Sequence, residues 1–203
     1  MKGTFGTGSV RLGALALAIA GSSAAYATNL NITLTCDDAF EAFISTNDSV
    51  QGTSFLTDDN WWPTTESGST ALTPGMTNYL HIKGWDLYGA VSALIASLSL
   101  SDALFEFENG LQTLDTDTTY WGLSTTGWGV NDLTPTDLGA NGTGPWGTIG
   151  GVNGAARFIW NGTGGVTGID HYFSVKINPV PEPATLSALA LGAAALLRRR
   201  RRK

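Results

Sequence analysis

The feature that most constrains the fold of this chain is a two-residue alternation of apolar and polar side chains. In residues 29–36 (NLNITLTC), apolar side chains stand at every second position, and four later segments repeat the pattern. These segments are 78–85 (NYLHIKGW), 104–109 (LFEFEN), 157–162 (RFIWNG) and 171–178 (HYFSVKIN). Because successive side chains of a β-strand point to opposite faces, each segment is expected to form a half-buried antiparallel strand.

Glycine-containing turn sequences separate these segments. They stand at residues 73–75 (TPG), 108–110 (ENG), 141–145 (NGTGP) and 161–165 (NGTGG). Many short strands with regular turns between them are typical of a β-sandwich. We therefore predict an all-β fold, an antiparallel β-sandwich, over residues 28–178.

Residues 88–102 (YGAVSALIASLSLSD) could begin as a short helical turn at 89–93 or run as a strand. We favour a strand whose inward side chains are Leu94, Ala96, Leu98 and Leu100. In the segment 157–162, the spacing of two residues predicts that Phe158 and Trp160 share a face.

The chain has one cysteine, Cys36, so an intrachain disulfide is excluded. Cys36 occupies an apolar position of the segment 29–36 and is expected to be a small buried residue of a strand. The alternative is a disulfide between two chains in an oxidising compartment.

Charge is divided sharply along the chain. Residues 28–180 hold three cationic and sixteen acidic side chains, a net charge of −13. Such a region repels phosphate backbones, which disfavours nucleic acid as a partner. The same charge could attract divalent cations.

The N-terminus has the pattern of a secretory signal peptide over residues 1–27. Lys2 and Arg11 precede an apolar run at 12–21, and small residues end in the pair Ala25 and Ala27 of an A-x-A site. We predict a signal helix, recognition by the secretion machinery and cleavage after Ala27. An uncleaved N-terminal membrane anchor is the alternative.

The C-terminus combines an apolar segment with a cationic tail. Residues 184–197 are uncharged, and six cations follow them: Arg198, Arg199, Arg200, Arg201, Arg202 and Lys203. A fourteen-residue helix covers about 21 Å, less than the roughly 30 Å hydrocarbon core of a bilayer. We predict a single short transmembrane helix whose cationic end stays in the cytoplasm, with residues 28–180 outside.

The sequence Val180-Pro181-Glu182-Pro183, followed by this apolar segment and the arginine cluster, resembles the PEP-CTERM sorting signal. The resemblance covers residues 180–203. It implies recognition by exosortase, a membrane-embedded transpeptidase-like enzyme, and processing near the Pro-Glu-Pro. It also implies an inner-membrane intermediate held by the C-terminal helix, delivery to the cell surface or extracellular matrix, and exopolysaccharide as a partner. A plain C-terminal tail anchor is the alternative.

Three stretches of the middle region, 34–55, 60–86 and 107–129, resemble jelly-roll, galactose-binding-like domains. The resemblance is carried by the Asp37-Asp38 pair ahead of Phe40 and by residues 75–82 (GMTNYLHI) with Trp85 and Asp86 after them. It implies a jelly-roll version of the sandwich and, in some domains of this kind, a structural calcium ion.

Chemistry-bearing residues point to binding more than to catalysis. The chain has no G-x-S-x-G, H-E-x-x-H, C-x-x-C or P-loop motif, so a non-catalytic protein is expected. Aromatic faces that could stack on sugars are those of Trp61, Trp62, Trp128 and Trp146. Carboxylates that could bind calcium are those of Asp37, Asp38, Asp86 and Asp115. The plainer alternatives are core tryptophans and solvated turn residues.

These observations support an exported surface or matrix protein, structural or carbohydrate-binding, with no cofactor other than calcium. Two alternatives stay open. One is a secreted hydrolase that acts on polysaccharide with two carboxylates across a cleft. The other is a calcium-stabilised adhesion module.

Overall fold

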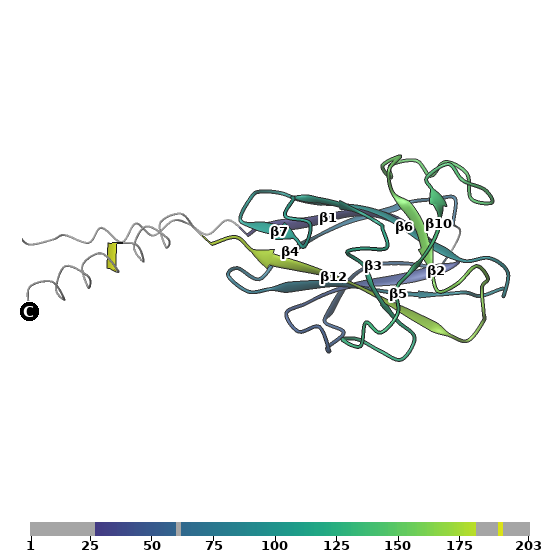
Figure 1. Ribbon diagram of the computed structural model, residues 1–203, viewed down its shortest axis with the longest axis horizontal. Helices are drawn as coiled ribbons and strands as arrows, with labels where there is room; N and C mark the ends of the chain where they lie inside the picture. The colour runs from purple at the N-terminus through teal and green to yellow at the C-terminus, as the bar shows by residue number, and fades with distance from the viewer. Residues whose placement is uncertain (1–26, 60–61, 182–190, 193–203) are drawn as a thin grey trace, which may run out of the picture.

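The computed structural model describes residues 27–59, 62–181 and 191–192. In this part of the chain, two antiparallel sheets of six strands each pack face to face as a sandwich (Figure 1). Sheet A consists of β1 (Asn29–Asp37), β4 (Glu66–Ala71), β6 (Ala93–Leu100), β8 (Thr113–Asp115), β10 (Thr136–Ala140) and β11 (Arg157–Trp160). Sheet B consists of β2 (Ala39–Ser45), β3 (Thr53–Asp58), β5 (Asn78–Trp85), β7 (Phe105–Phe107), β9 (Gly122–Ser124) and β12 (Asp170–Pro179). The predicted all-β antiparallel sandwich is confirmed.

Alternation in the sequence places the core between the sheets. The apolar side chains of β1 are buried, as are Leu80 and Ile82 of β5 and Phe173 and Val175 of β12. Residues 93–100 form a strand, as expected, and their inward side chains Leu94, Ala96, Leu98 and Leu100 join the same core. Cys36 is a free, buried cysteine, and burial raises the pKa of its thiol.

Several strands carry no apolar stripe that would predict them. The clearest is β4 (ESGSTA), an edge strand that pairs with β1 through residues 66–71. The chain also crosses from sheet A to sheet B over the single residue Asp38, between β1 and β2. The Asp38 carboxylate accepts a hydrogen bond from the N–H of Leu87 (2.8 Å), which fixes this crossing against the end of β5.

The outer face of sheet A is divided into an apolar and a polar half. On β6, Ala93 and Ile95 point outward and are covered by the segment 141–156, which contributes Trp146 to a second apolar cluster. Farther along β6, the outward side chains are Ser97 and Ser99, and both are half-buried. The change from apolar to hydroxyl side chains along β6 therefore marks where the covering segment ends.

The prediction that Phe158 and Trp160 share a face is wrong. Phe158 belongs to the outer cluster beneath Trp146, whereas Trp160 lies in the main core against His171 and Phe173. β11 pairs with β6 only at Ile159, and its ladder with β10 shifts register between Asp137 and Gly139, so β11 does not alternate as a regular strand does.

Gly84 makes room for the Trp160 ring in the main core. A Cβ atom at Gly84 would lie 3.2 Å from that ring and 3.1 Å from the Cys36 sulfur, closer than ordinary van der Waals contact. The bare backbone of β5 at this position therefore lets the indole pack between the two sheets.

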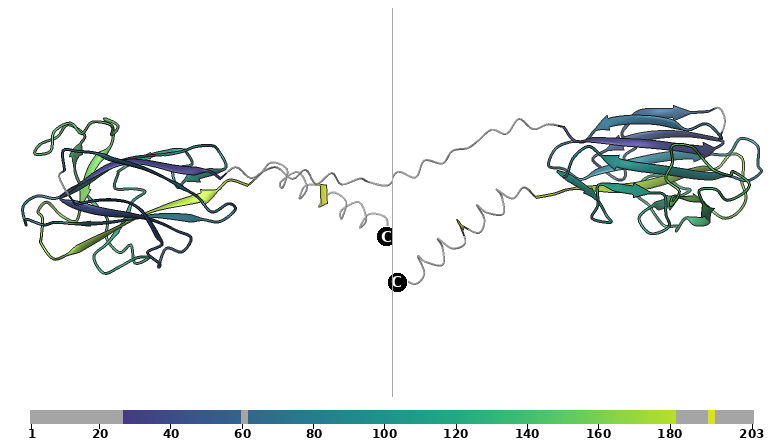
Figure 2. Two further views of the ribbon diagram at one scale, coloured as in Figure 1. Left: turned by 180° about the vertical axis from the view of Figure 1, so that it is seen from behind. Right: turned by 90° about the horizontal axis from the view of Figure 1, so that it is seen from above.

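The described chain enters and leaves the sandwich at the same end, as both views in Figure 2 show. The carbonyl of Asn29 accepts from the N–H of Ser101 (2.9 Å), and the N–H of Val180 donates to the carbonyl of Leu104 (2.8 Å). The predicted signal helix with Ala25, and the apolar segment 184–197 apart from residues 191–192, lie outside the described residues. Within the described residues, no helix has both the length and the apolar character that crossing a bilayer requires.

Candidate binding sites on the outer faces of the sandwich

A cleft of about 440 Å³ lies on the outer face of sheet B. Tyr79 of β5 and Ser174 and Lys176 of β12 reach this face because they alternate with core residues of the same strands. The other lining residues are Asp48, Glu108, Thr118, Thr119, Tyr120, Trp121, Gly122, Asn131, Leu133 and Thr134. The cleft thus combines aromatic rings, carboxylates, an amide and an ammonium group.

Asp48 organises the floor of this cleft through three side-chain hydrogen bonds. Its Oδ1 accepts from Ser174 Oγ (2.8 Å) and lies 3.2 Å from His81 Nε2, while its Oδ2 accepts from Asn131 Nδ2 (3.0 Å). The His81 side chain is fully buried, and its Nδ1 lies 3.2 Å from the carbonyl oxygen of Gln51. Three segments that are distant in sequence, carrying His81, Asn131 and Ser174, are thus fixed to one carboxylate.

Trp128 lies over the buried His81 and holds the loop that forms one wall. The two rings stack with centroids 4.4 Å apart and planes 16° apart. The same indole contacts Tyr172 edge-on (4.8 Å) and Phe43 edge-on (6.0 Å). One face of the indole is therefore covered by His81, and the half-buried ring fixes the loop that carries Asn131.

Two carboxylates, those of Asp48 and Glu108, line the same cleft. Asp48 is held in the network just described, and Glu108 lies 3.5 Å from the Lys176 ammonium in an ion pair exposed to solvent. Exposed pairs of this kind contribute little to stability. Together these groups give the cleft both hydrogen-bond donors and acceptors.

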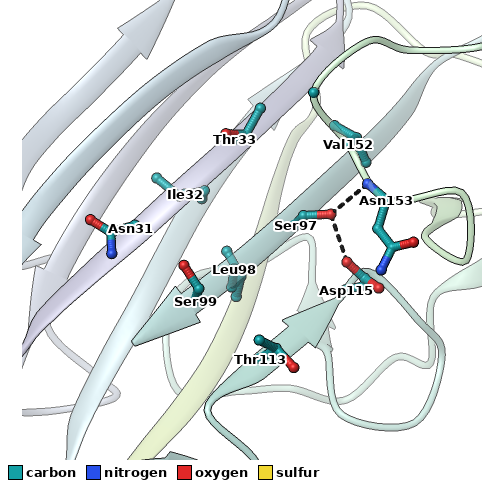
Figure 3. A pocket seen from close by; sticks show the side chains of 11 residues that line it. Asn31, Ile32, Thr33, Ser97, Leu98, Ser99, Thr113, Asp115, Val152 and Asn153 are labelled. Carbon is teal, nitrogen blue, oxygen red and sulfur yellow. Dashed lines mark hydrogen bonds between the residues drawn. The ribbon is translucent and has the colours of Figure 1, made fainter. Parts of the chain in front are cut away.

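A second hollow, a groove of about 530 Å³, lies on the polar half of the outer face of sheet A (Figure 3). Its floor is formed by β1 and β6, and its walls by β8 and the segment 151–153. The Ser97 hydroxyl joins floor and walls: it donates to Asp115 Oδ1 (2.6 Å) and accepts from the N–H of Asn153 (2.9 Å), as the dashed lines in Figure 3 show.

The tryptophans expected to bind ligand are dispersed by the fold. Trp61 lies outside the described residues, and Trp62 is half-buried against the outer apolar cluster. Trp146 is only 7 % exposed, stacks on Phe158 and donates its indole N–H to Asp37 Oδ2 (2.8 Å). Its ring is thus part of the core and has no open face for a sugar.

The aspartates expected to bind calcium are only partly brought together. Asp37, Asp38 and Asp86 interact electrostatically at one end of the sandwich, while Asp115 lies apart in the sheet A groove. The Oδ1 atom of Asp86 accepts hydrogen bonds from the N–H groups of Tyr88 and Gly89 (both 2.8 Å). No group of three or more His, Cys, Asp or Glu side chains among the described residues is arranged to hold a metal ion.

Asp37 is the most perturbed carboxyl of this group. Burial, a hydrogen bond with Asp38 and the charges of Asp38 and Asp86 raise the pKa of Asp37 to about 7, against a lowering contribution from the Trp146 N–H. A neutral Asp37 near neutral pH is better suited to a structural hydrogen bond than to coordination of a cation, which needs the ionised carboxylate.

Sequence reasoning missed most residues of the sheet B cleft. Asp48, Tyr79, Tyr120 and Asn131 lie on separate segments that only the tertiary fold brings together. The outward position of Tyr79 follows from its alternation with Leu80, which is the one signal the sequence carries.

The far C-terminus is identified by comparison with protein families. Residues 179–202 match the PEP-CTERM protein-sorting motif. The motif confirms the resemblance seen at the Pro-Glu-Pro and indicates an exported protein that exosortase sorts across the membrane. Neither the curated proteins nor the solved structures give a significant match to the chain. The sorting motif therefore indicates a route of export. It lies after the sandwich in the chain and gives no information about what the sandwich binds.

Replacing Asp48 by alanine should destabilise the sandwich by about 1–3 kcal/mol, because it leaves the buried Nε2 of His81 and the hydroxyl of Ser174 without their Asp48 partner. Thermal or urea denaturation measures this loss. The matched control is Asp132→Ala, which removes an exposed carboxylate one residue beyond Asn131. An equal effect of both substitutions would contradict the organising role of Asp48.

Proposed function

We propose that this exosortase-sorted protein is a non-catalytic, polysaccharide-binding component of the cell surface or extracellular matrix. Its sheet B cleft would hold the glycan. We further take the sandwich to be a jelly-roll domain of the galactose-binding-like kind.

One observation carries the proposal: a single cleft contains two tyrosine rings, Tyr79 and Tyr120, beside an amide, two carboxylates and an ammonium group. Sugar rings present C–H faces that pack on aromatic rings and hydroxyls that both donate and accept hydrogen bonds. Sites for small ligands typically combine apolar surface with a few fixed polar groups in this way. The network around Asp48 supplies the fixed groups.

The charge of the domain selects among polysaccharides. With a net charge of −13 over residues 28–180, the domain repels acidic glycans, so a neutral polysaccharide is the expected ligand.

Binding of the full-length protein to immobilised neutral polysaccharides tests the proposal. Tyr79→Ala should weaken binding about 2- to 12-fold, the equivalent of roughly 0.5–1.5 kcal/mol for a lost aromatic contact. The matched control is Tyr88→Ala, because Tyr88 is 79 % exposed and does not line the cleft. Failure of the wild-type protein to bind any neutral polysaccharide, or an equal loss in both variants, would overturn the proposal.

A secreted polysaccharide hydrolase is the second candidate, favoured by the two carboxylates that share the cleft. Hydrolysis would require one of them to donate a proton, whereas the structure engages Asp48 with three donors and Glu108 with Lys176. Release of reducing sugar ends that is lost in Glu108→Gln would establish hydrolysis, and its absence leaves binding alone.

A further inference from the structure

Resting on the proposed function for the sheet B cleft, we propose that the groove of sheet A is a second glycan site. One molecule would then hold two neutral polysaccharide chains on its opposite faces and cross-link them.

The two hollows lie on opposite surfaces because of strand alternation. Leu98 of β6 points into the core, so Ser97 and Ser99 point outward from sheet A. Val175 of β12 points into the same core, so Ser174 points outward from sheet B. Both layers of the sandwich separate the groove from the cleft, and a chain in one site leaves the other free.

Strand register arranges the groove floor and its margin into two rows of polar side chains that cross the sheet. The first row is Ser67, Thr33, Ser97 and Asp115, and the second row is Ser69, Asn31, Ser99 and Thr113. All eight are short polar side chains, whereas the outward residues of β6 under the covering segment are apolar.

The first row satisfies its own hydrogen bonds. The Thr33 and Ser67 hydroxyls lie 2.9 Å apart, and Ser97 donates to Asp115 (2.6 Å). In the second row, the side chains of Ser69, Asn31, Ser99 and Thr113 make no hydrogen bond within the described part of the chain. The second row is therefore an open line of donors and acceptors beside a line that is internally paired.

The wall segment turns this face into a groove. Gly151 adopts a positive φ of 80°, and a Cβ at this position would lie 3.3 Å from Thr33 Cγ2. Glycine thus lets residues 151–153 approach β1 closely, and the N–H of Asn153 anchors the segment to Ser97. This wall, with Val152 and Asn153, lies beside Ser97 and Asp115 of the first row (Figure 3).

The chemistry of the lining defines the ligand. Among the described residues, no cationic side chain lines the groove, and Asp115, the one carboxylate among these lining residues, already accepts from Ser97. An anionic ligand would meet no counter-charge, whereas an uncharged chain of hydroxyl groups can both donate to and accept from the open row. Four positions at the strand spacing of about 4.8 Å span roughly 14 Å. The sugar rings of an extended β-linked polysaccharide follow one another at an interval similar to this strand spacing.

Titration calorimetry of the full-length protein with cellohexaose, a neutral β-1,4-linked hexasaccharide, tests the proposal. The wild-type chain should bind two molecules. The double variant Asn31→Ala, Ser99→Ala should weaken one of the two sites about tenfold without lowering Tm, because neither side chain has a partner to lose. The matched control Asn161→Ala, Ser54→Ala removes the same side-chain types outside both hollows.

The possible outcomes distinguish failure of the groove assignment from failure of the cleft assignment. Tyr79→Ala should leave the groove intact, and each single-site variant should raise the turbidity of a long neutral β-glucan solution less than the wild-type chain does. A single binding site that only Tyr79→Ala weakens would overturn the second site and leave the proposed function standing. Two sites retained in the Asn31/Ser99 variant, or no binding of cellohexaose by the wild-type chain, would overturn the groove assignment.

Discussion

Ending the chain after Pro181 should abolish its sorting by exosortase while leaving the β-sandwich folded. The truncation removes most of the matched motif at 179–202, including the apolar segment and the cationic tail. It keeps the last contact of the sandwich, the hydrogen bond from the Val180 N–H to the Leu104 carbonyl. The truncated protein should be exported but released, because nothing holds it in the membrane for processing.

Cell fractionation and the mass of the protein, with and without exosortase, measure this result. The double substitution Pro181→Ala, Pro183→Ala should block the exosortase-dependent change in mass while keeping the apolar segment 184–197. Pro74→Ala is the matched control, because it changes an exposed proline in a turn far from the motif. Normal processing of the Pro181/Pro183 variant would contradict recognition at the Pro-Glu-Pro.

Replacing Asp37 by asparagine should remove a large part of the pH dependence of stability. Burial raises the pKa of Asp37 to about 7 in the folded state, against about 3.9 in an unfolded chain. Between these values the folded state binds the extra proton, so the free energy of unfolding falls as pH rises and levels off above about 7. Asparagine mimics the neutral acid and can still accept the hydrogen bond from the Trp146 indole.

The wild-type sandwich should be more stable at pH 5 than at pH 8 by about 2–3 kcal/mol, at up to about 1.4 kcal/mol per pH unit. Urea unfolding at the two pH values measures the difference, which Asp37→Asn should largely abolish. Asp132→Asn removes one exposed carboxylate and controls for the net charge of the domain. A difference of unchanged size in Asp37→Asn would show that another group carries it.

Sequence periodicity was sufficient for strands with one buried face. Leu30, Ile32 and Leu34 of β1 alternate with polar residues because one face meets the core and the other meets solvent. The same logic failed for β4, an edge strand without an apolar face, and for Trp160, whose position depends on the space left by Gly84. In both cases the deciding contacts come from strands distant in sequence.

The positions of the candidate ligand residues also depend on contacts between segments that are distant in sequence. Trp146 and Trp128 are equally aromatic in sequence, yet one lies in the outer apolar cluster and the other lies over a buried histidine. The Asp37-Asp38 pair was noted as a cation site, but burial favours the neutral acid at Asp37. Burial is a property of the assembled layers, and residue type alone does not determine it.

By itself the sequence determined the route of the protein and the class of its fold. The sorting motif is a continuous stretch of the sequence, residues 179–202, and alternation is a local consequence of strand geometry. Only the tertiary structure decided where a ligand could bind. The cleft joins Asp48, Asn131 and Ser174 from segments far apart in the chain, and the groove depends on the register of four strands. Such sites exist only after long-range pairing has fixed which outward side chains become neighbours.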